Sequence, residues 1–441
     1  MVKRPWVRCR RHHAKTGSRS VSDITSVFDG LTLPDGACVF NPALVHVAGQ
    51  VYCLFARVYN ASETAKRCAP GHMDRSPFLD GWRGQSTNVL AVIRLSSRPM
   101  DAKLDAKLMG YSYIGHTNLE DGRMFKDMRG RMFVYLALPM GAHPKRAVVN
   151  TVSRVFIRCS RSADSCSVSL GFPRWLPYFG SPSVMDKNWV PWNGTAFMSF
   201  SHYGTFGPHS VFNWGSYDDP LPHTKFDAVA EDSVFTAFAR RYGKLLHLAG
   251  GTPAVLEPSG SSFLAVGHLK AHPGCFHPEA LPAWVDRSGP YGGRGAAMQA
   301  RCDHLAASAN DTTRGEVLQI AFDFRHDNGT GTHYPLDYAF FLYRFNATPP
   351  YNMTHISYGF MPYTWRTAVD HTGIVFPIGL ERFGADDYII TYGDSDQVSK
   401  ALLLSIRQAE AMLWPLAEIG RRLDEYTVCA LPCEGEAHCA Y

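Results

Sequence analysis

The chain has 441 residues, of which 45% are hydrophobic and 12% aromatic, so it can bury a large core in one big β domain or two smaller ones. Charged residues make up 19% of the chain and the formal net charge is +5, which is modest for this length. The body of the chain shows no nucleic-acid-binding face, so we predict no nucleic-acid partner. No run of eighteen apolar residues occurs, so the sequence also predicts no integral membrane segment.

The N-terminal segment is basic. Its cationic residues are Lys3, Arg4, Arg8, Arg10, Arg11, His12, His13, Lys15 and Arg19. Residues 1–30 are also rich in serine and show no hydrophobic period, which predicts a disordered arm. Binding of this arm to an acidic surface is the alternative. The segment has the positive charge of a signal peptide but lacks the apolar core that should follow.

Six Asn-x-Ser/Thr sequons occur, at Asn60, Asn193, Asn310, Asn328, Asn346 and Asn352. Sequons arise by chance at roughly one Asn in eight, so six exceed the expectation and favour the secretory pathway or Golgi lumen. Because no signal peptide is visible, the compartment stays open.

The eleven cysteines fit an oxidising compartment weakly, and their odd number leaves one thiol unpaired or intermolecular. Cys159 and Cys166 are placed to bridge a hairpin. Cys429, Cys433 and Cys439 are placed to staple the tail, or with His438 to bind zinc. His438 and Cys439 are adjacent in the chain, and the spacing of the four residues matches no common zinc finger, so we predict no metal site.

Alternating apolar runs predict strands in five successive units. The strand ranges are 39–47, 51–58 and 88–95; 120–125, 132–138 and 152–158; 186–192 and 196–202; 250–256, 262–268 and 338–345; and 373–380, 387–394 and 401–406. Asn193-Gly194 is a strong hairpin turn in the third unit. An insertion at about 271–334, rich in Gly, Pro and His, interrupts the fourth unit and contains a strand-like run at 316–322.

Five units of three or four short strands predict an all-β fold, a five-bladed β-propeller over residues 31–405, with a pair of β-sandwiches as the competitor. From Arg407 to Tyr426 apolar residues recur at helical spacing, which predicts an amphipathic helix that Pro415 kinks. We therefore divide the chain into the arm at 1–30, the propeller at 31–405 and a helix with a Cys-containing tail at 406–441.

The acidic pair Glu120-Asp121, followed by Arg123, precedes a strand-like run. An acidic pair among apolar residues is costly to bury, so it faces water, an ion partner or a substrate; a salt-bridged turn is the plain alternative. The innermost strand of each propeller blade lines a central channel, so residues that open the units converge at one mouth. These residues are Asn41, Glu120, Asp121, Lys187, Asn188, Gly251, Thr252 and Gly379, with Arg57, Arg123, His202 and Tyr392 on following strands.

Three stretches carry a family resemblance: Phe40-Asn41-Pro42-Ala43, Leu54-Phe55-Ala56-Arg57 and Glu120-Asp121-Gly122-Arg123. They resemble glycoside hydrolase family 130, five-bladed propellers that include β-mannoside phosphorylases, in which Pro stands at the position of Gly122. They are also similar to the mannosyltransferase/phosphorylases of glycosyltransferase family 108. The matching motifs cover mainly residues 37–140. Tyr392-Gly393-Asp394-Ser395-Asp396 resembles the Tyr-Gly-x-x-Asp that closes many sugar-active five-bladed propellers.

The resemblance implies sugar chemistry, and the carboxylates restrict the reaction. Glycosidases need two carboxylates across the scissile bond. Five-bladed hydrolases of the inulinase type place an Asp in blade one and a Glu in blade three, where this chain has Asn41 and Lys187-Asn188. A single acid beside cations suits phosphorolysis, in which phosphate is itself the nucleophile. It equally suits transfer from a sugar nucleotide, in which the cations stabilise the leaving diphosphate.

We therefore expect an enzyme that makes or phosphorolyses mannoside-like bonds on a glycan, with a preference for glycosyl transfer. Asp121 is the expected general acid or base. Glu120, Asn41, Asn188, Thr252, His202, Tyr392 and Asp396 are expected to bind sugar, and Arg57, Arg123 and Lys187 phosphate. No cofactor is firmly implied; a sugar nucleotide or sugar 1-phosphate is the expected substrate. A non-catalytic, lectin-like propeller and a glycoside hydrolase are the alternatives, and the oligomeric state stays open.

Overall fold

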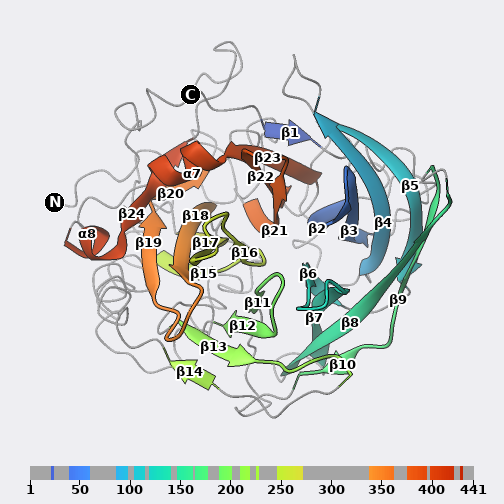
Figure 1. Cartoon of the computed structure of the whole chain (residues 1–441), viewed down its shortest axis with the longest axis horizontal. Coiled ribbons are helices and arrows are strands. Elements are labelled where there is room, and N and C mark those ends of the chain that lie inside the picture. Colours follow the sequence, from blue (N-terminus) through green and yellow to red (C-terminus); the bar gives the residue numbers. More distant parts are fainter. Residues whose placement is uncertain are drawn as a thin grey trace, which may run out of the picture.

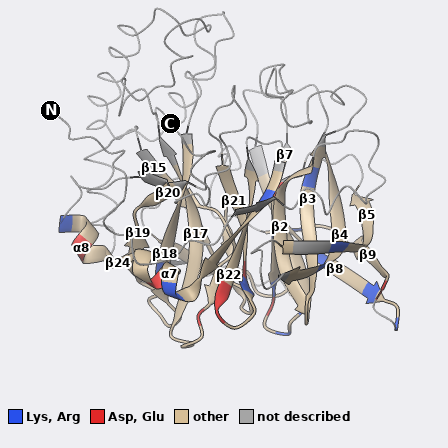
Figure 2. Ribbon diagram, turned by 90° about the horizontal axis from the view of Figure 1, so that it is seen from above, with Lys and Arg blue, Asp and Glu red and all other residues tan. Residues whose placement is uncertain are grey.

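The computed structural model describes residues 21–23, 39–59, 86–97, 104–114, 119–140, 147–161, 164–176, 188–200, 209–218, 225–227, 246–271, 337–361, 375–394, 398–421 and 428–430. These residues are mostly strands, so the predicted all-β class is confirmed. Within them, no helix is long and apolar enough to cross a membrane. In Figure 2 most of the strand length is tan, and the charged residues lie mainly near strand ends, in turns and on the two short helices.

The described strands form five sheets, which follow one another around a common centre in Figure 1. The first sheet contains β2 (Val39–Ala48), β3 (Val51–Tyr59), β4 (Ser86–Ser97) and β5 (Leu104–Ile114). The second contains β6 (Glu120–Lys126), β7 (Met132–Met140), β8 (Ala147–Cys159), β9 (Cys166–Leu170) and β10 (Arg174–Trp175). The third contains β11 (Val190–Pro191), β12 (Phe197–Phe200), β13 (Ser210–Asn213) and β14 (Lys225–Asp227).

The fourth sheet contains β15 (Leu246–Gly250), β16 (Val255–Leu256), β17 (Ser262–Ala271), β18 (Asp337–Asn346), β19 (Met353–Ser357), β20 (Gly359–Met361), β24 (Leu413–Pro415) and β25 (Val428–Ala430). The fifth contains β21 (Val375–Phe383), β22 (Asp387–Asp394), β23 (Val398–Ser405) and β1 (Val21–Asp23). β2, β6, β11, β16 and β21 lie nearest the centre in Figure 1. We call β2, β6, β11, β15, β16 and β21 the inner strands.

Two short strands lie where the sequence predicted other structure. β1 falls inside the expected arm and pairs with β23, so that the first described strand shares a sheet with the last unit of the chain. β24 interrupts the expected C-terminal helix. The chain instead forms α7 (Ile406–Met412), which a capping box of Ser405 and Gln408 begins, and α8 (Leu416–Arg421). The physical reason is tertiary pairing of Leu413–Pro415 with β19, which a helical period cannot reveal.

Two other expectations concern connections. The predicted Cys159–Cys166 disulfide is confirmed, and it joins β8 to β9. β17 and β18 pair from Ser262 with Asn346 to Ala271 with Asp337, so residues 272–336 connect two adjacent strands. The expected strand at 316–322 lies outside the described residues, as do Cys433, His438 and Cys439 of the tail.

The core lies between sheets and is rich in aromatic rings. Trp189, Trp192 and Trp214 have almost no exposed surface. Trp192 contacts Phe263 and Phe345 of the fourth sheet, so it fills the space between the third and fourth sheets. Their burial makes these three tryptophans core residues rather than surfaces on which a sugar ring could stack.

The Asn193-Gly194 turn ties four sheets together near the ends of the inner strands. The Asn193 side chain accepts a hydrogen bond from the Lys126 amide at 2.8 Å and donates one to Glu381 at 2.9 Å. Its own amide donates to Ala254 at 2.8 Å, and the Gly194 amide donates to the Lys126 carbonyl at 2.9 Å. The oxygen and the nitrogen of the Asn193 side chain are thus both engaged within the protein. Glycosylation of the six sequons stays a prediction.

Glu381 of β21 is the ionisable residue among the hydrogen-bond partners of Asn193. Burial raises the pKa of its carboxyl to about 7, while Lys126, the His46 amide and the Asn193 side chain partly oppose that effect. Glu381 in turn adds to burial in raising the pKa of Tyr52 on β3 to about 12. The carboxyl is therefore neutral in mild acid and becomes charged close to neutral pH.

This shift makes stability depend on pH. Since the pKa of Glu381 is higher in the folded state, the folded protein keeps the proton between about pH 4.5 and 7 while the unfolded chain releases it. The free energy of unfolding therefore falls across that window, by on the order of 3 kcal/mol for this one group. We predict that Glu381→Gln, which removes the charge and keeps one oxygen to accept from Asn193, is the more stable protein at pH 8 and similar to wild type near pH 4.5.

Urea unfolding at several pH values measures this effect. Asp386→Asn removes an exposed carboxyl beside the same strand and serves as the matched control, with little expected change. A wild-type protein that is more stable than Glu381→Gln at pH 8 would contradict the prediction.

Candidate functional site

Three polar residues at the starts of the inner strands share an unusual backbone conformation. Asn41, Asp121 and Asn188 have φ angles of 52°, 50° and 74°, the left-handed region that Asn and Asp enter more readily than most residues. In the first two sheets the pairing register shifts at this point, between Phe40 and Ala43 and between Glu120 and Arg123. The extra residue of such a bulge re-aims side chains, and bulges are common next to active sites. The fifth sheet has a similar shift between Pro377 and Gly379.

An ion pair joins the first sheet to the second at this level. The Arg57 Nη1 atom lies 3.5 Å from Asp121 Oδ1, and both side chains are more than nine-tenths buried. The Arg57 guanidinium also lies over the Phe40 ring, 5.0 Å from its centroid. Arg57 lies on β3, where it pairs in register with Phe40 of β2. The structure therefore brings together the expected acid and one of the expected phosphate ligands.

Arg123 is completely buried and connects three sheets. Its Nη1 donates to the Asp121 carbonyl at 2.9 Å, its Nη2 donates to Asn188 Oδ1 at 3.0 Å, and its Nε donates to the Gly251 carbonyl. Burial lowers the pKa of the guanidinium, an effect that Tyr135, Asp121 and Tyr343 oppose. All three nitrogens bond within the protein, so these contacts give Arg123 a structural role; a phosphate contact of this residue stays a prediction.

Two close approaches shape the space around the pair. A side-chain carbon added at Gly122 would lie 2.3 Å from the Phe55 ring, so Phe55 occupies the place that a proline ring would need. This accounts for the glycine in the Glu120-Asp121-Gly122-Arg123 motif. A carbon added at Gly393 would lie 1.8 Å from Asn41 Oδ1, so the Asn41 side chain rests directly on the backbone of the fifth sheet.

Two further residues that we expected to bind sugar belong to the packed interior. Thr252 has no exposed surface; its hydroxyl donates to the Pro253 carbonyl at 3.0 Å and accepts from the Val266 amide at 3.0 Å. Tyr392 is also fully buried, and its ring packs edge-on against Phe340 in the core. Both contacts stabilise sheets. Substrate binding by either residue stays a prediction.

Four expected site residues cannot be placed as side chains. Lys187, His202 and Asp396 lie outside the described residues, and Glu120 is described only as the first residue of β6. Sequence reasoning missed Asn88, a fully buried amide on β4. Asn88 pairs in register with Arg57 and its Nδ2 donates to the Leu119 carbonyl at 3.4 Å, just ahead of the acidic pair. A lone asparagine opening an apolar strand was the available signal.

The chemistry open to this group is limited. Asp121 can give or take a proton, and Arg57 can hold an anion through charge-assisted hydrogen bonds. Among the side chains that the structure describes, no group of three or more His, Cys, Asp or Glu residues could hold a metal ion.

The sequence matches no protein-family profile and no curated protein. Solved structures do match. A structure of the glycoside hydrolase family 130 of mannoside phosphorylases, which contains glycoside hydrolases that target β-1,2 mannosidic linkages in Candida mannan, has a TM-score of 0.43 at 12% identity, covering 89% of this chain and 96% of that one.

A GDP-Man-dependent mannosyltransferase from Leishmania mexicana has a TM-score of 0.40 at 11% identity, covering 90% of this chain and 93% of that one. A mannose phosphorylase from the same organism, in complex with a phosphate ion, has a TM-score of 0.39 at 9% identity, covering 90% and 92%. The chain thus resembles both classes that its motifs indicated. Matches at this level assign neither a family nor an activity to it.

The role of Arg123 leads to a prediction. A lysine keeps the positive charge but cannot reach three acceptors in three directions, so Arg123→Lys leaves buried carbonyl or amide oxygens without a donor. We expect a loss of about 3 kcal/mol in the free energy of unfolding, measured by urea denaturation. Arg407→Lys, at an exposed position of α7, is the matched control and should change stability little. Equal stability of Arg123→Lys and wild type would show that the three contacts are not structural.

Proposed function

We propose that the five sheets are the blades of a five-bladed β-propeller whose main strands lie within residues 31–405, with an insertion at about 271–334 in the fourth blade and the C-terminal segment packed on its flank. β1, β24 and β25 join these sheets from outside that range. Three observations support this assignment. The sheets succeed one another in chain order around the centre, their inner strands meet there, and β1 completes the fifth sheet. Leu416 and Ile419 of α8 are buried, as a packed flank requires.

We further propose that the protein is a carbohydrate-active enzyme that makes or phosphorolyses mannoside-like glycosidic bonds, with glycosyl transfer as the favoured direction. The observation that carries the proposal is the buried Arg57–Asp121 pair, which joins β3 of the first sheet to the inner strand β6 of the second. A carboxyl and a guanidinium in one dry site supply the two groups that such a reaction needs, a proton donor and an anion holder. The motif resemblance supports the choice of sugar.

In phosphorolysis, a phosphate oxygen attacks the anomeric carbon while the bond from that carbon to the glycosidic oxygen breaks. The Asp121 carboxyl gives its proton to the departing oxygen, and in the synthetic direction the carboxylate takes a proton from the acceptor hydroxyl. A phosphate that binds Arg57 replaces Asp121 as the partner of that guanidinium, so anion binding frees the carboxyl to act. With a sugar nucleotide, Arg57 would hold the leaving diphosphate instead.

The other residues take supporting roles in this proposal. Arg123 is a positioning residue, because it holds the Asp121 backbone and Asn188 rather than an anion. Asn41 and Asn188 flank Asp121 on neighbouring sheets, where they would contact sugar hydroxyls, and Glu120 would do the same. Lys187 immediately precedes Asn188 in the chain and is a second candidate for phosphate.

A carbohydrate-binding propeller without turnover is the second candidate. The observation that favours it is the number of site groups already engaged inside the protein, namely Arg123, Asn188 and Thr252. A glycoside hydrolase is less well supported. Hydrolysis needs a second carboxyl opposite Asp121. Besides Asp121, Glu381 is the buried carboxyl on an inner strand among the described side chains, and it is hydrogen-bonded to Asn193 rather than to the Arg57–Asp121 pair.

Replacement of Asp121 by Asn tests the proposal. The amide fills the same space but cannot give up a proton as an acid, so we expect turnover to fall by at least about 100-fold. The assay incubates the protein with mannose 1-phosphate or GDP-mannose and acceptor sugars and measures release of phosphate or GDP. Circular dichroism should show an unchanged fold.

Asp164→Asn, at an exposed position between β8 and β9, is the matched control and should keep wild-type activity. Wild-type protein that binds the sugar with no release of phosphate or GDP would support the non-catalytic candidate. Mannose released from a mannoside without phosphate or acceptor would support hydrolysis. Undiminished turnover by Asp121→Asn would remove Asp121 from the mechanism.

A further inference from the structure

Four large exposed hydrophobic side chains belong to the second sheet and its connections. The exposed large hydrophobic residues of the described part of the chain are Tyr113, Met128, Phe156, Phe172, Trp175 and Leu256, and those four are Met128, Phe156, Phe172 and Trp175. Met128 is 70% exposed at the turn between β6 and β7, and Phe172 is 89% exposed in the connection between β9 and β10. Single exposed apolar residues are ordinary, whereas a group on one sheet suggests an interaction surface.

Both turns hold their apolar residue firmly. Around Met128, one carboxylate oxygen of Asp127 accepts hydrogen bonds from the Arg129 and Arg131 amides at 2.9 Å, and the Gly130 amide donates to the Asp127 carbonyl. At the second turn, the Gly171 amide donates to the Arg154 carbonyl at 2.7 Å, next to Phe172. The exposure of Met128 and Phe172 is therefore built into the backbone.

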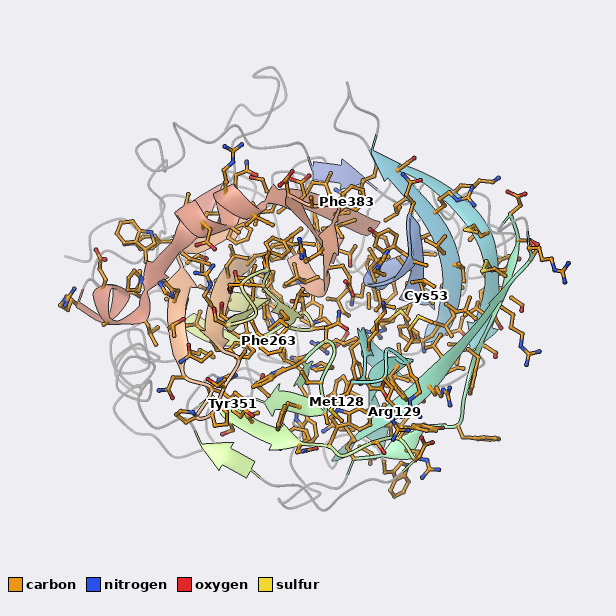
Figure 3. All side chains as sticks on the ribbon, in the orientation of Figure 1. Cys53, Met128, Arg129, Phe263, Tyr351 and Phe383 are labelled. Carbon is orange, nitrogen blue, oxygen red and sulfur yellow. A yellow bond between two sulfur atoms is a disulfide. The ribbon has the colours of Figure 1, made fainter. Side chains whose placement is uncertain are left out.

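Two consecutive residues between β13 and β14 connect the turns. The Tyr217 hydroxyl donates to the Phe172 carbonyl at 2.7 Å. The neighbouring Asp218 carboxylate pairs with Arg131, which starts the return from the Met128 turn. Tyr217 and Asp218 thus hold the two apolar tips at adjoining places. In Figure 3, Met128 and Arg129 lie on the side of the ring where β7 and β13 run.

Arginines surround the tips. Arg154 lies over the Phe156 ring and Arg174 over the Tyr217 ring, each 4.9 Å from the ring centroid. The hydrogen bond from Arg131 lowers the pKa of Asp218, and the charges of Arg154 and Arg129 add to that effect, so these arginines gather around one carboxylate. Arg131 also pairs with Asp127 at 2.7 Å. Three arginines therefore act on Asp218, and Arg174 lies on the ring of the neighbouring Tyr217. With four arginines against Asp127 and Asp218, the patch is cationic.

We propose that these two tips and their arginines form a docking surface for an anionic lipid surface. The apolar tips would enter the boundary between head groups and acyl chains, and the planar guanidinium groups would bind lipid phosphates or carboxylates. This would be peripheral attachment of the folded protein. It is independent of the function proposed for the Arg57–Asp121 pair.

Two features favour a lipid surface over other occupants. Met128 and Phe172 project from turns rather than lining a groove, so they suit insertion into a soft layer better than a fit to a rigid partner. A second copy of the same patch would set arginines against arginines, which disfavours self-association there. A nucleic acid would pair with the arginines but leave both apolar tips in water.

Flotation of the full-length protein with vesicles tests the proposal. The probes are vesicles of phosphatidylcholine alone and vesicles with about 30% phosphatidylserine. We expect binding to the anionic vesicles that is at least about tenfold stronger and that weakens with salt. The double variant Met128→Ser, Phe172→Ser should lose binding by about tenfold, and Arg129→Gln with Arg174→Gln should lose most of the preference for anionic lipid.

Leu256→Ser, on the fourth sheet, removes an exposed apolar side chain of comparable size and should bind like wild type. All variants keep the basic residues at 3–19, so a contribution from that segment is common to them. Absence of wild-type binding, or undiminished binding by the Ser double variant, would overturn the proposal. Binding of poly-glutamate without binding of vesicles would also overturn it, in favour of an acidic protein segment.

Discussion

The guanidinium of Arg123 lies where three sheets meet, and the placement of the candidate site depends on it. A buried charge without partners is very costly, so Arg123 is tolerable there only because carbonyl and amide oxygens of the second, third and fourth sheets accept its hydrogen bonds. The Arg57–Asp121 pair adds the first sheet, and Asn41 rests on the backbone of the fifth. Through these contacts the inner strands are fixed to one another at the level of the left-handed residues.

A second set of contacts holds the inner strands further along. Asn193 links the second, third, fourth and fifth sheets through its side chain and its backbone amide. Functional groups on strands that are fixed at two levels keep their geometry better than groups on loops. Asp121 is therefore well placed to act in a fixed position, because Arg123 holds its backbone and Arg57 holds its carboxylate.

Much of this architecture could be predicted from the sequence, because alternating apolar residues identify strands and a Gly turn identifies a hairpin. The convergence of Arg57 with Asp121 was expected because Asp121 opens the second unit and Arg57 lies on the strand that follows the opening of the first. The role of Arg123 could not be predicted, since a sequence does not show whether a guanidinium faces a substrate or three carbonyl and amide oxygens. Likewise Asn193 was recognised as a turn residue and a sequon, while its partners lie 67 and 188 residues away. β1 and β24 are short and pair only through tertiary contacts, which local patterns do not encode.

In the proposed reaction an anion takes the place of Asp121 beside Arg57 and frees that carboxyl for a sugar oxygen. A crystal structure of the protein with mannose 1-phosphate bound tests this exchange of partners directly. We predict the phosphate in hydrogen-bond contact with Arg57, the sugar beside Asp121, and Arg123 still bonded to Asp121, Asn188 and Gly251. A ligand bound elsewhere, with the Arg57–Asp121 pair intact, would contradict it.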